Sequence, residues 1–137
     1  MLGLDDANST EIKADAMNPV VDLLPEQKSV SDLGGSLRLG ANEILIKDNT
    51  NAHKIYRRDV ISKRHRHRYE INKKYIPEFE KNGLIFSAES DGGKRMEMLE
   101  IPSHKFYLGV QFHPEFNSRP GFPEEVFEAF VKASAEK

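Results

Sequence analysis

The chain has 137 residues, which allows one domain with one core and argues against two complete domains. Its 20 Lys and Arg residues and 22 Asp and Glu residues give a formal net charge of −2, so no overall charge directs it to nucleic acid or to an anionic membrane. The sequence contains no cysteine, which excludes disulfides, thiolate metal sites and a cysteine nucleophile for this chain acting alone.

Residues 1–40 are expected to be a loop-rich lead-in. Between Met1 and Gln27, polar turn residues surround a short apolar run bracketed by Pro19 and Pro25, which predicts a loop with at most one turn of structure. Residues 29–40 contain three glycines and are predicted to be a second loop. No run approaches the roughly 18 apolar residues of a membrane span, and Met1 to Glu11 lack Lys and Arg. We therefore expect no membrane segment and no basic leader, and a cytoplasmic chain.

The middle of the chain predicts a strand, a basic run and a short helix. Residues 42–47 alternate in the manner of a strand, and 61–72 hold a basic run that ends in an apolar-polar-apolar pattern. Residues 75–82 predict a short helix that turns Phe79 inward, with Gly83 just past its end as a C-cap.

The last third predicts three strands and a helix. The strands are 84–88, 95–101 and 106–112, with a turn at 91–93 between the first two. The third is an almost continuous apolar run, which predicts a strand covered on both faces. Apolar residues at helical spacing predict a helix over 123–134. Residues 41–137 thus predict an α/β fold, an incomplete doubly wound half-domain of strands followed by a C-terminal helix.

The strongest candidate site lies at the end of the third strand, in the string G-V-Q-F-H-P-E-F over 109–116. There a buried strand delivers His113 and Glu115, and Pro114 fixes the turn between them. A carboxylate beside one imidazole nitrogen fixes the tautomer and stabilises the protonated ring, as a general base requires. On spacing alone, a pair that merely caps the strand end in solvent stays equally open.

The basic run from Lys63 to Tyr69 is a second candidate. Its cations could bind phosphate or nucleic acid, and His65 and His67 could chelate a metal. Strand alternation places both His residues on one face and the Arg residues on the other, so two His residues without a third ligand make a poor metal site. On composition alone a solvated charge run is favoured, and no metal is expected.

A third candidate, Gly34-Gly35-Ser36, opens like a nucleophile elbow. Arg38 stands where the motif needs its last glycine, and no apolar strand precedes it. We therefore do not expect Ser36 to be a nucleophile.

The string over 109–116 resembles the signature of class I glutamine amidotransferases. Further strings are similar to the branch of that family that aminates UTP to CTP: D-A-N-S-T-E over 6–11, D-L-G-G-S-L-R-L-G over 32–40, R-H-R-H-R-Y-E-I-N over 64–72 and F-N-S-R-P over 116–120. The resemblance covers essentially the whole chain and implies a partial flavodoxin-like class I amidotransferase domain. It favours the catalytic interpretation of His113 and Glu115.

The resemblance implies a glutaminase that hydrolyses L-glutamine through a Cys-His-Glu triad and passes ammonia to a synthetase domain. By this likeness His113 is the general base and Glu115 its orienting carboxylate. Glu11 would hold the amino group of glutamine and Arg68 its carboxylate, which are charge-assisted contacts suited to an amino acid. No cofactor is expected in this chain, since ATP and Mg would belong to the synthetase domain and GTP would be an activator. A homo-oligomer is also expected.

The chain departs from the family pattern because it contains no cysteine. Met1-Leu2-Gly3-Leu4 is similar to the end of the helix that follows the nucleophile. The resemblance therefore implies the C-terminal half of a glutaminase domain. This half would be a truncated product, a deliberately shortened chain or one part of a split protein.

Two hypotheses about function follow. The chain supplies the base and the glutamine-binding half of an amidotransferase site, or it is a catalytically inactive binding or regulatory fragment. In either case, unpaired strand edges predict self-association.

Overall fold

The structure is a computed structural model that describes residues 2–23 and 37–136. The predicted glycine loop at 29–36 and the candidate nucleophile Ser36 lie outside the described residues. The helices and strands are, in chain order, β1 (Ala7–Ser9), β2 (Asn18–Leu23), β3 (Arg38–Ile46), α1 (Asn51–Tyr56), β4 (Val60–His67), β5 (Tyr69–Ile71), the 3-10 helix Lys73–Tyr75, α2 (Ile76–Lys81), β6 (Ile85–Ser90), β7 (Arg95–Glu100), β8 (Leu108–Val110), the 3-10 helix Pro114–Asn117 and α3 (Glu125–Ala135).

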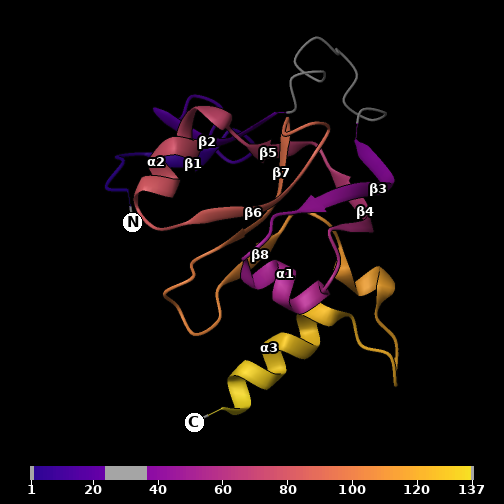
Figure 1. The fold of residues 1–137 in the computed structure, drawn as a ribbon. Helices are drawn as coiled ribbons and strands as arrows, with labels where there is room; N and C mark the ends of the chain where they lie inside the picture. Colours follow the sequence, from indigo (N-terminus) through magenta and orange to yellow (C-terminus); the bar gives the residue numbers. More distant parts are fainter. Residues whose placement is uncertain (1, 24–36, 137) are drawn as a thin grey trace.

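These elements build two sheets. Five strands form the larger sheet in the order β4-β3-β6-β7-β8, with every neighbouring pair antiparallel. The smaller sheet has the order β1-β2-β5, in which β1 and β2 run parallel. Figure 1 shows the small sheet and α2 at one end of the molecule, and α1 and α3 at the other.

The core lies on one face of the larger sheet. Buried and exposed residues alternate along β3 and β4, and the buried ones face the core. Ile44 and Ile46 of β3 are buried between exposed neighbours, and Ile61 of β4 lies opposite Ile44 in the register. The buried cluster consists of Ile44, Ile46, Ala52, Tyr56, Ile61, Ala88, Met98 and Phe112. Phe112, near the end of the predicted third strand, thus anchors the segment that leads into His113.

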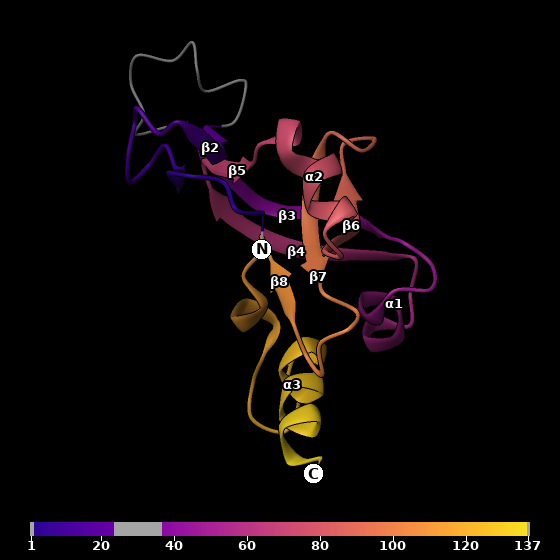
Figure 2. The ribbon, with the colours of Figure 1, turned by 90° about the vertical axis from the view of Figure 1, so that its left-hand side faces the viewer.

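The C-terminal helix α3 is confirmed, but most of its apolar face is uncovered by the described residues. Only Val126 is buried, while Phe130 is 55% exposed and Val131 is 64% exposed. Figures 1 and 2 show that α3 extends away from the larger sheet. No helix in residues 2–23 and 37–136 has both the length and the apolar character to cross a bilayer.

The two N-terminal loop predictions are wrong where the structure describes them. The sequence predicts a loop over 1–27, but this stretch contains β1 and β2, because β5 pairs with β2 and supplies a partner from far along the chain. The second predicted loop extends to residue 40, yet β3 begins at Arg38. Gly40 sits inside this strand with a φ of +87°, which glycine adopts without strain.

The third predicted strand is shorter and less covered than expected. It spans Leu108–Val110, and its three residues are all half-buried. Because none of the three is fully buried, the expectation of a strand covered on both faces is wrong among the described residues. β8 is also the last strand of the larger sheet in the described order. The other two strands of this group, β6 and β7, are confirmed, as is the turn at 91–93, where Asp91, Gly92 and Gly93 all have positive φ.

Candidate functional site

The segment after β8 holds His113 and Glu115 side by side. The backbone N–H of Gln111 donates to the Glu97 carbonyl at 2.9 Å, and that of His113 donates to the Arg64 carbonyl at 2.9 Å. These bonds hold the segment to β7 and to β4. Pro114 is buried and opens a 3-10 helix that brings Glu115 back toward the imidazole.

The ring nitrogen Nδ1 of His113 lies 2.7 Å from Oε1 of Glu115. The hydrogen bond from His113 lowers the pKa of the Glu115 carboxyl below its usual range, so the carboxylate is charged at neutral pH. A charged acceptor beside Nδ1 makes that nitrogen the donor and leaves the lone pair of the neutral ring on Nε2. The side chains are 38% and 56% exposed, so a reacting group can reach the ring.

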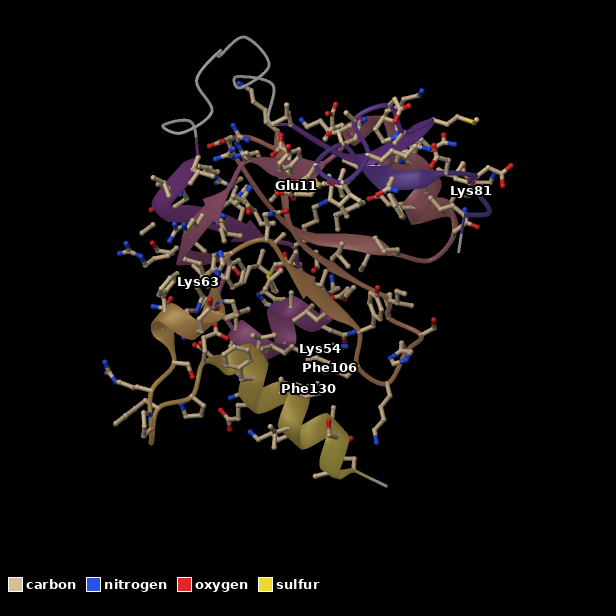
Figure 3. The ribbon with its side chains drawn as sticks, turned by 180° about the vertical axis from the view of Figure 1, so that it is seen from behind. Glu11, Lys54, Lys63, Lys81, Phe106 and Phe130 are labelled. Atoms are coloured by element: carbon tan, nitrogen blue, oxygen red, sulfur yellow. The ribbon has the colours of Figure 1, made fainter. Side chains whose placement is uncertain are left out.

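Glu11 and Arg68 line one open cavity of about 610 Å³. Its lining consists of Glu11, Val21, Leu37, Arg66, His67, Arg68, Tyr69 and Gln111. The volume lies in the range of small-molecule sites, and it presents a carboxylate and two guanidinium groups. That charge pattern suits an α-amino acid, which carries one ammonium and one carboxylate. In Figure 3 Glu11 lies at the opposite end of the molecule from α3.

The structure brings the four predicted site residues together in two pairs. His113 and Glu115 touch, and Glu11 and Arg68 share the cavity, but neither His113 nor Glu115 is among the described residues that line it. The two pairs are joined through the backbone, since Gln111 lines the cavity and leads into His113, while the Arg64 carbonyl that holds His113 belongs to the strand ahead of Arg68.

The predicted alternation of β4 is confirmed, but the interpretation of the run as solvated is wrong for two of its members. Lys63 and His65 are buried, whereas Arg64 and Arg66 are exposed. Nδ1 of His65 lies 3.1 Å from Nε2 of His67. Among the described residues, the one group with metal-ligating geometry is Asp48, His53 and Asp59, on the connection around α1.

Lys63 is buried because it pairs with a carboxylate at the start of α3. Its Nζ lies 2.5 Å from Oε1 of Glu124, with the side chains 8% and 0% exposed. The Tyr56 hydroxyl donates to the same oxygen at 2.7 Å, and burial together with that carboxylate raises the pKa of Tyr56 well above its usual range. The other oxygen of Glu124 accepts from the Val126 N–H at 2.8 Å and caps the helix. Figure 3 shows Lys63 next to the start of α3.

The sequence interpretation missed several residues of this region. Arg66, His67 and Gln111 line the cavity, and all three lie inside strings that carry the family resemblance. Strand alternation also placed His67 on the face of His65, which is the signal that could have identified its partner. Nothing local in the sequence marks Arg38 and Glu97, a buried ion pair with 2.5 Å between Nη1 and Oε1, because they come from distant strands.

Comparisons with known proteins identify the family of this chain. Residues 11–133 match the family described as glutamine amidotransferase class-I. The chain is 52% identical to a CTP synthase of Archaeoglobus fulgidus and 51% identical to one of Staphylococcus saprophyticus, each over 134 residues that make up 98% of this chain and 25% of the relative. The chain therefore spans about a quarter of the length of these curated relatives.

A solved structure carries a similar fold. It is described as the Trypanosoma brucei CTPS glutaminase domain with bound acivicin, and it matches with a TM-score of 0.91 and 36% sequence identity. The match covers 100% of this chain and 53% of that chain. The α/β class and the C-terminal helix expected from the sequence are those of this neighbour.

Proposed function

This chain belongs to the class I glutamine amidotransferase family, and from that premise we propose that it supplies the base and the glutamine-binding groups of a CTP synthase glutaminase site. One observation carries the proposal. His113 Nδ1 lies 2.7 Å from Glu115 Oε1, on a segment whose Gln111 lines the cavity of Glu11 and Arg68. The similarity to CTP synthases over nearly the whole chain supports the choice of this branch of the family.

In the proposed binding mode, the cavity holds L-glutamine by both of its charges. The guanidinium of Arg68 donates to the α-carboxylate, and the carboxylate of Glu11 accepts from the α-ammonium group. Arg66 lines the same cavity and adds positive potential on the carboxylate side. The side-chain amide then points away from these charges and toward the groups that react.

In the proposed mechanism, Nε2 of His113 takes the proton of a thiol, and the thiolate attacks the amide carbon of glutamine. The protonated ring then gives its proton to the leaving nitrogen, so ammonia departs and a thioester remains. His113 next takes a proton from the water that hydrolyses the thioester, and glutamate leaves with the thiol restored. Glu115 stabilises the imidazolium in both steps and fixes the tautomer.

The thiol must come from another segment, because this chain contains no cysteine. The same fact favours a second candidate function, in which the chain binds glutamine or a regulator without turnover. The whole-enzyme roles belong to the proposal as well. Ammonia would aminate UTP to CTP with ATP and Mg in a synthetase domain, GTP would activate, and the assembly would be a cytoplasmic homo-oligomer.

The test is ammonia release from L-glutamine, measured for this chain alone and after mixing with the remainder of the Archaeoglobus fulgidus relative. We expect background release from the chain alone and restored release from the mixture. In the mixture, His113→Ala should lower release by about 10²- to 10⁴-fold, whereas the control His104→Ala, at an exposed position, should leave it unchanged. Release by the chain alone would overturn the requirement for an external thiol. A mixture that binds glutamine without turnover would support the second candidate.

A further inference from the structure

Arg68 lies between two strands that belong to different sheets. β4 ends at His67, where it pairs with Arg38 in the larger sheet, and β5 begins at Tyr69, where it pairs with Leu23 in the smaller one. Arg68 is the residue at which the chain crosses from one sheet to the other. Its direction into the cavity therefore depends on what holds the backbone on either side.

Besides the strand pairing on either side, a side chain holds the backbone at this point. Nδ1 of His67 lies 3.0 Å from the Tyr69 carbonyl oxygen, so the imidazole bridges the crossing point. The amide of Gln111 approaches the same carbonyl at 3.4 Å. The Tyr69 carbonyl thus links the turn at Arg68 to the segment that leads into His113.

The hydrogen bonds fix the tautomers of two rings. A carbonyl only accepts, so Nδ1 of His67 carries the proton and, in the neutral ring, Nε2 is an acceptor. That acceptor lies 3.1 Å from Nδ1 of His65, which must therefore be the donor. Nε2 of His65 is then the unprotonated nitrogen, and it has no hydrogen-bond partner among the described residues. Both bonds point the same way, from His65 through His67 to the carbonyl.

The surroundings keep both rings neutral. The groups that face His65 are Glu97 of β7, at 3.7 Å from Nδ1, Arg38 of β3, and His113 after β8. Glu97 is already satisfied in part by Arg38 and by the Ser90 hydroxyl. Burial lowers the pKa of His65 to about 4 and outweighs the attraction of Glu97.

The same direction holds for His67. Burial also lowers its pKa, Arg38 and Arg95 add to the effect, and Glu97 and the Tyr69 carbonyl oppose it. Because both rings are neutral at pH 7, the two hydrogen bonds can run in only one direction, with His65 donating to His67 and His67 donating to the carbonyl.

We propose that His67 is a positioning residue of the glutamine subsite. Oriented by His65, it holds the Tyr69 carbonyl and so fixes the direction in which Arg68 enters the cavity. The inference rests on the proposed function for the role of Arg68. The hydrogen bonds from His65 to His67 and from His67 to the Tyr69 carbonyl rest on the geometry alone. His67 is not proposed to touch a reacting atom.

Two substitutions separate this role from general packing. In His67→Asn the amide nitrogen occupies the place of Nδ1 and can still donate to the Tyr69 carbonyl. In His67→Gln the amide nitrogen lies farther out, near the place of Nε2, and that bond is lost. The two variants have the same chemical groups and differ in which contact they keep, so they serve as matched controls for each other.

The first measurement uses this chain alone. Long-range ¹H–¹⁵N spectra of the imidazoles should show both His65 and His67 as neutral Nδ1–H tautomers at pH 7. The backbone amides of Arg68 and Tyr69 should lose order in His67→Gln, seen as a lower heteronuclear NOE, and keep it in His67→Asn. An Nε2–H tautomer or an imidazolium at either residue, or equal order in both variants, would overturn the proposal whatever the fate of the proposed function.

The second measurement uses the mixture with the remainder of the Archaeoglobus fulgidus relative. His67→Gln should raise KM for glutamine about tenfold with kcat within about twofold, and His67→Asn should return KM to near the original value. Equal losses of kcat in both variants would indicate packing and contradict the positioning role. A mixture that is inactive even with the unaltered chain would count against the proposed function. The spectra would still test whether His65 and His67 form the proposed hydrogen bonds.

Discussion

At the scale of single residues, the groups proposed to move protons are distinct from the groups proposed to hold the substrate. His113 and Glu115 contact each other. Glu11 and Arg68 line a cavity, and neither His113 nor Glu115 is among the described residues of its lining. A group that binds substrate and transition state equally affects KM, whereas one that acts on the reacting atoms affects kcat. The two pairs should therefore respond differently to substitution.

Glu11→Gln and Arg68→Gln should each raise KM for glutamine while leaving kcat within a fewfold. Each change removes one charge-assisted contact worth about 1.5 to 3 kcal/mol, or about ten- to 150-fold in affinity. The measurement is steady-state ammonia release by the mixture with the Archaeoglobus fulgidus remainder. Glu80→Gln, at an exposed position of α2 outside the cavity lining, is the control. A fall in kcat with unchanged KM for either variant would refute the binding assignment.

How far the sequence could predict the site depends on how local its contacts are. The pair His113 and Glu115 could be predicted because Pro114 and the short 3-10 helix determine its geometry within a few residues. The cavity could be foreseen only through the family resemblance, since Glu11 lies between β1 and β2 whereas Arg68 lies between β4 and β5, far along the chain. The partner of Lys63 could not be predicted, because Glu124, the N-cap of α3, is far from Lys63 in the sequence and meets it only in the folded chain.

At the scale of elements, β4 carries a buried charge and a buried neutral imidazole on the same face. Lys63 is paired with Glu124, whereas His65 stays neutral because burial outweighs its attraction to Glu97. Both features affect the stability of the fold, and they do so in different ways. Removing the partner of a buried charge is costly at every pH, while a suppressed protonation is costly only where the unfolded chain can bind the proton.

Lys63→Met should destabilise the chain by about 3 to 5 kcal/mol, because it leaves the Glu124 carboxylate buried without its cation. Adding Glu124→Gln to Lys63→Met should recover part of this loss, since the uncompensated charge is then gone. The measurement is urea unfolding at pH 7. The control is Lys132→Met, which breaks the exposed pair with Glu128 and should change stability by less than about 1 kcal/mol. Equal effects of Lys63→Met and Lys132→Met would contradict the buried pair.

The chain should lose stability as the pH falls from about 6.5 to about 4. The pKa of His65 is lowered to about 4 in the folded chain, so within this window the unfolded state binds a proton that the folded state does not. His65 alone would contribute a loss of up to about 3 kcal/mol. Unfolding free energies measured across this window should fall less steeply for His65→Asn than for His104→Asn. Parallel curves for the two variants would show that His65 does not titrate in this way.

The elements themselves were predicted unevenly, for physical reasons. β3, β6 and β7 have alternating or apolar patterns that a half-buried strand requires, and they were found. β1 and β2 were missed because β1 has only three residues and β2 contains Pro19, so pairing with β5 rather than local propensity makes them strands. The last strand was predicted too long, since apolar residues continue past the hydrogen-bonded part into the segment that carries Phe112.

At the scale of the whole molecule, the described surface leaves several large apolar side chains uncovered. Phe130 and Val131 of α3 are exposed, as are Phe116 and Phe122 in the segment before it. The larger sheet has β4 and β8 at its ends in the described strand order. Exposed apolar side chains and strand edges both favour association.

The isolated chain should therefore self-associate in a concentration-dependent manner. Phe130→Glu together with Val131→Lys should shift the equilibrium toward monomer, because both substitutions place a charge on the uncovered face of α3. Sedimentation velocity from micromolar to near-millimolar concentration measures this. Ser103→Glu, at an exposed position outside α3, provides the control. A single monomeric species over the whole range would show that the uncovered face is not adhesive.

The most direct test of the central claim is His113→Ala in the mixture with the Archaeoglobus fulgidus remainder, with CTP formation measured separately from glutamine and from added ammonia. If His113 is the base, the glutamine-driven rate should fall by about 10²- to 10⁴-fold, while the ammonia-driven rate should stay unchanged because it bypasses glutamine hydrolysis. Glu115→Gln should give the same selective loss in a milder form. An equal fall of both rates in His113→Ala would contradict the role of His113 as the base and make it a structural residue.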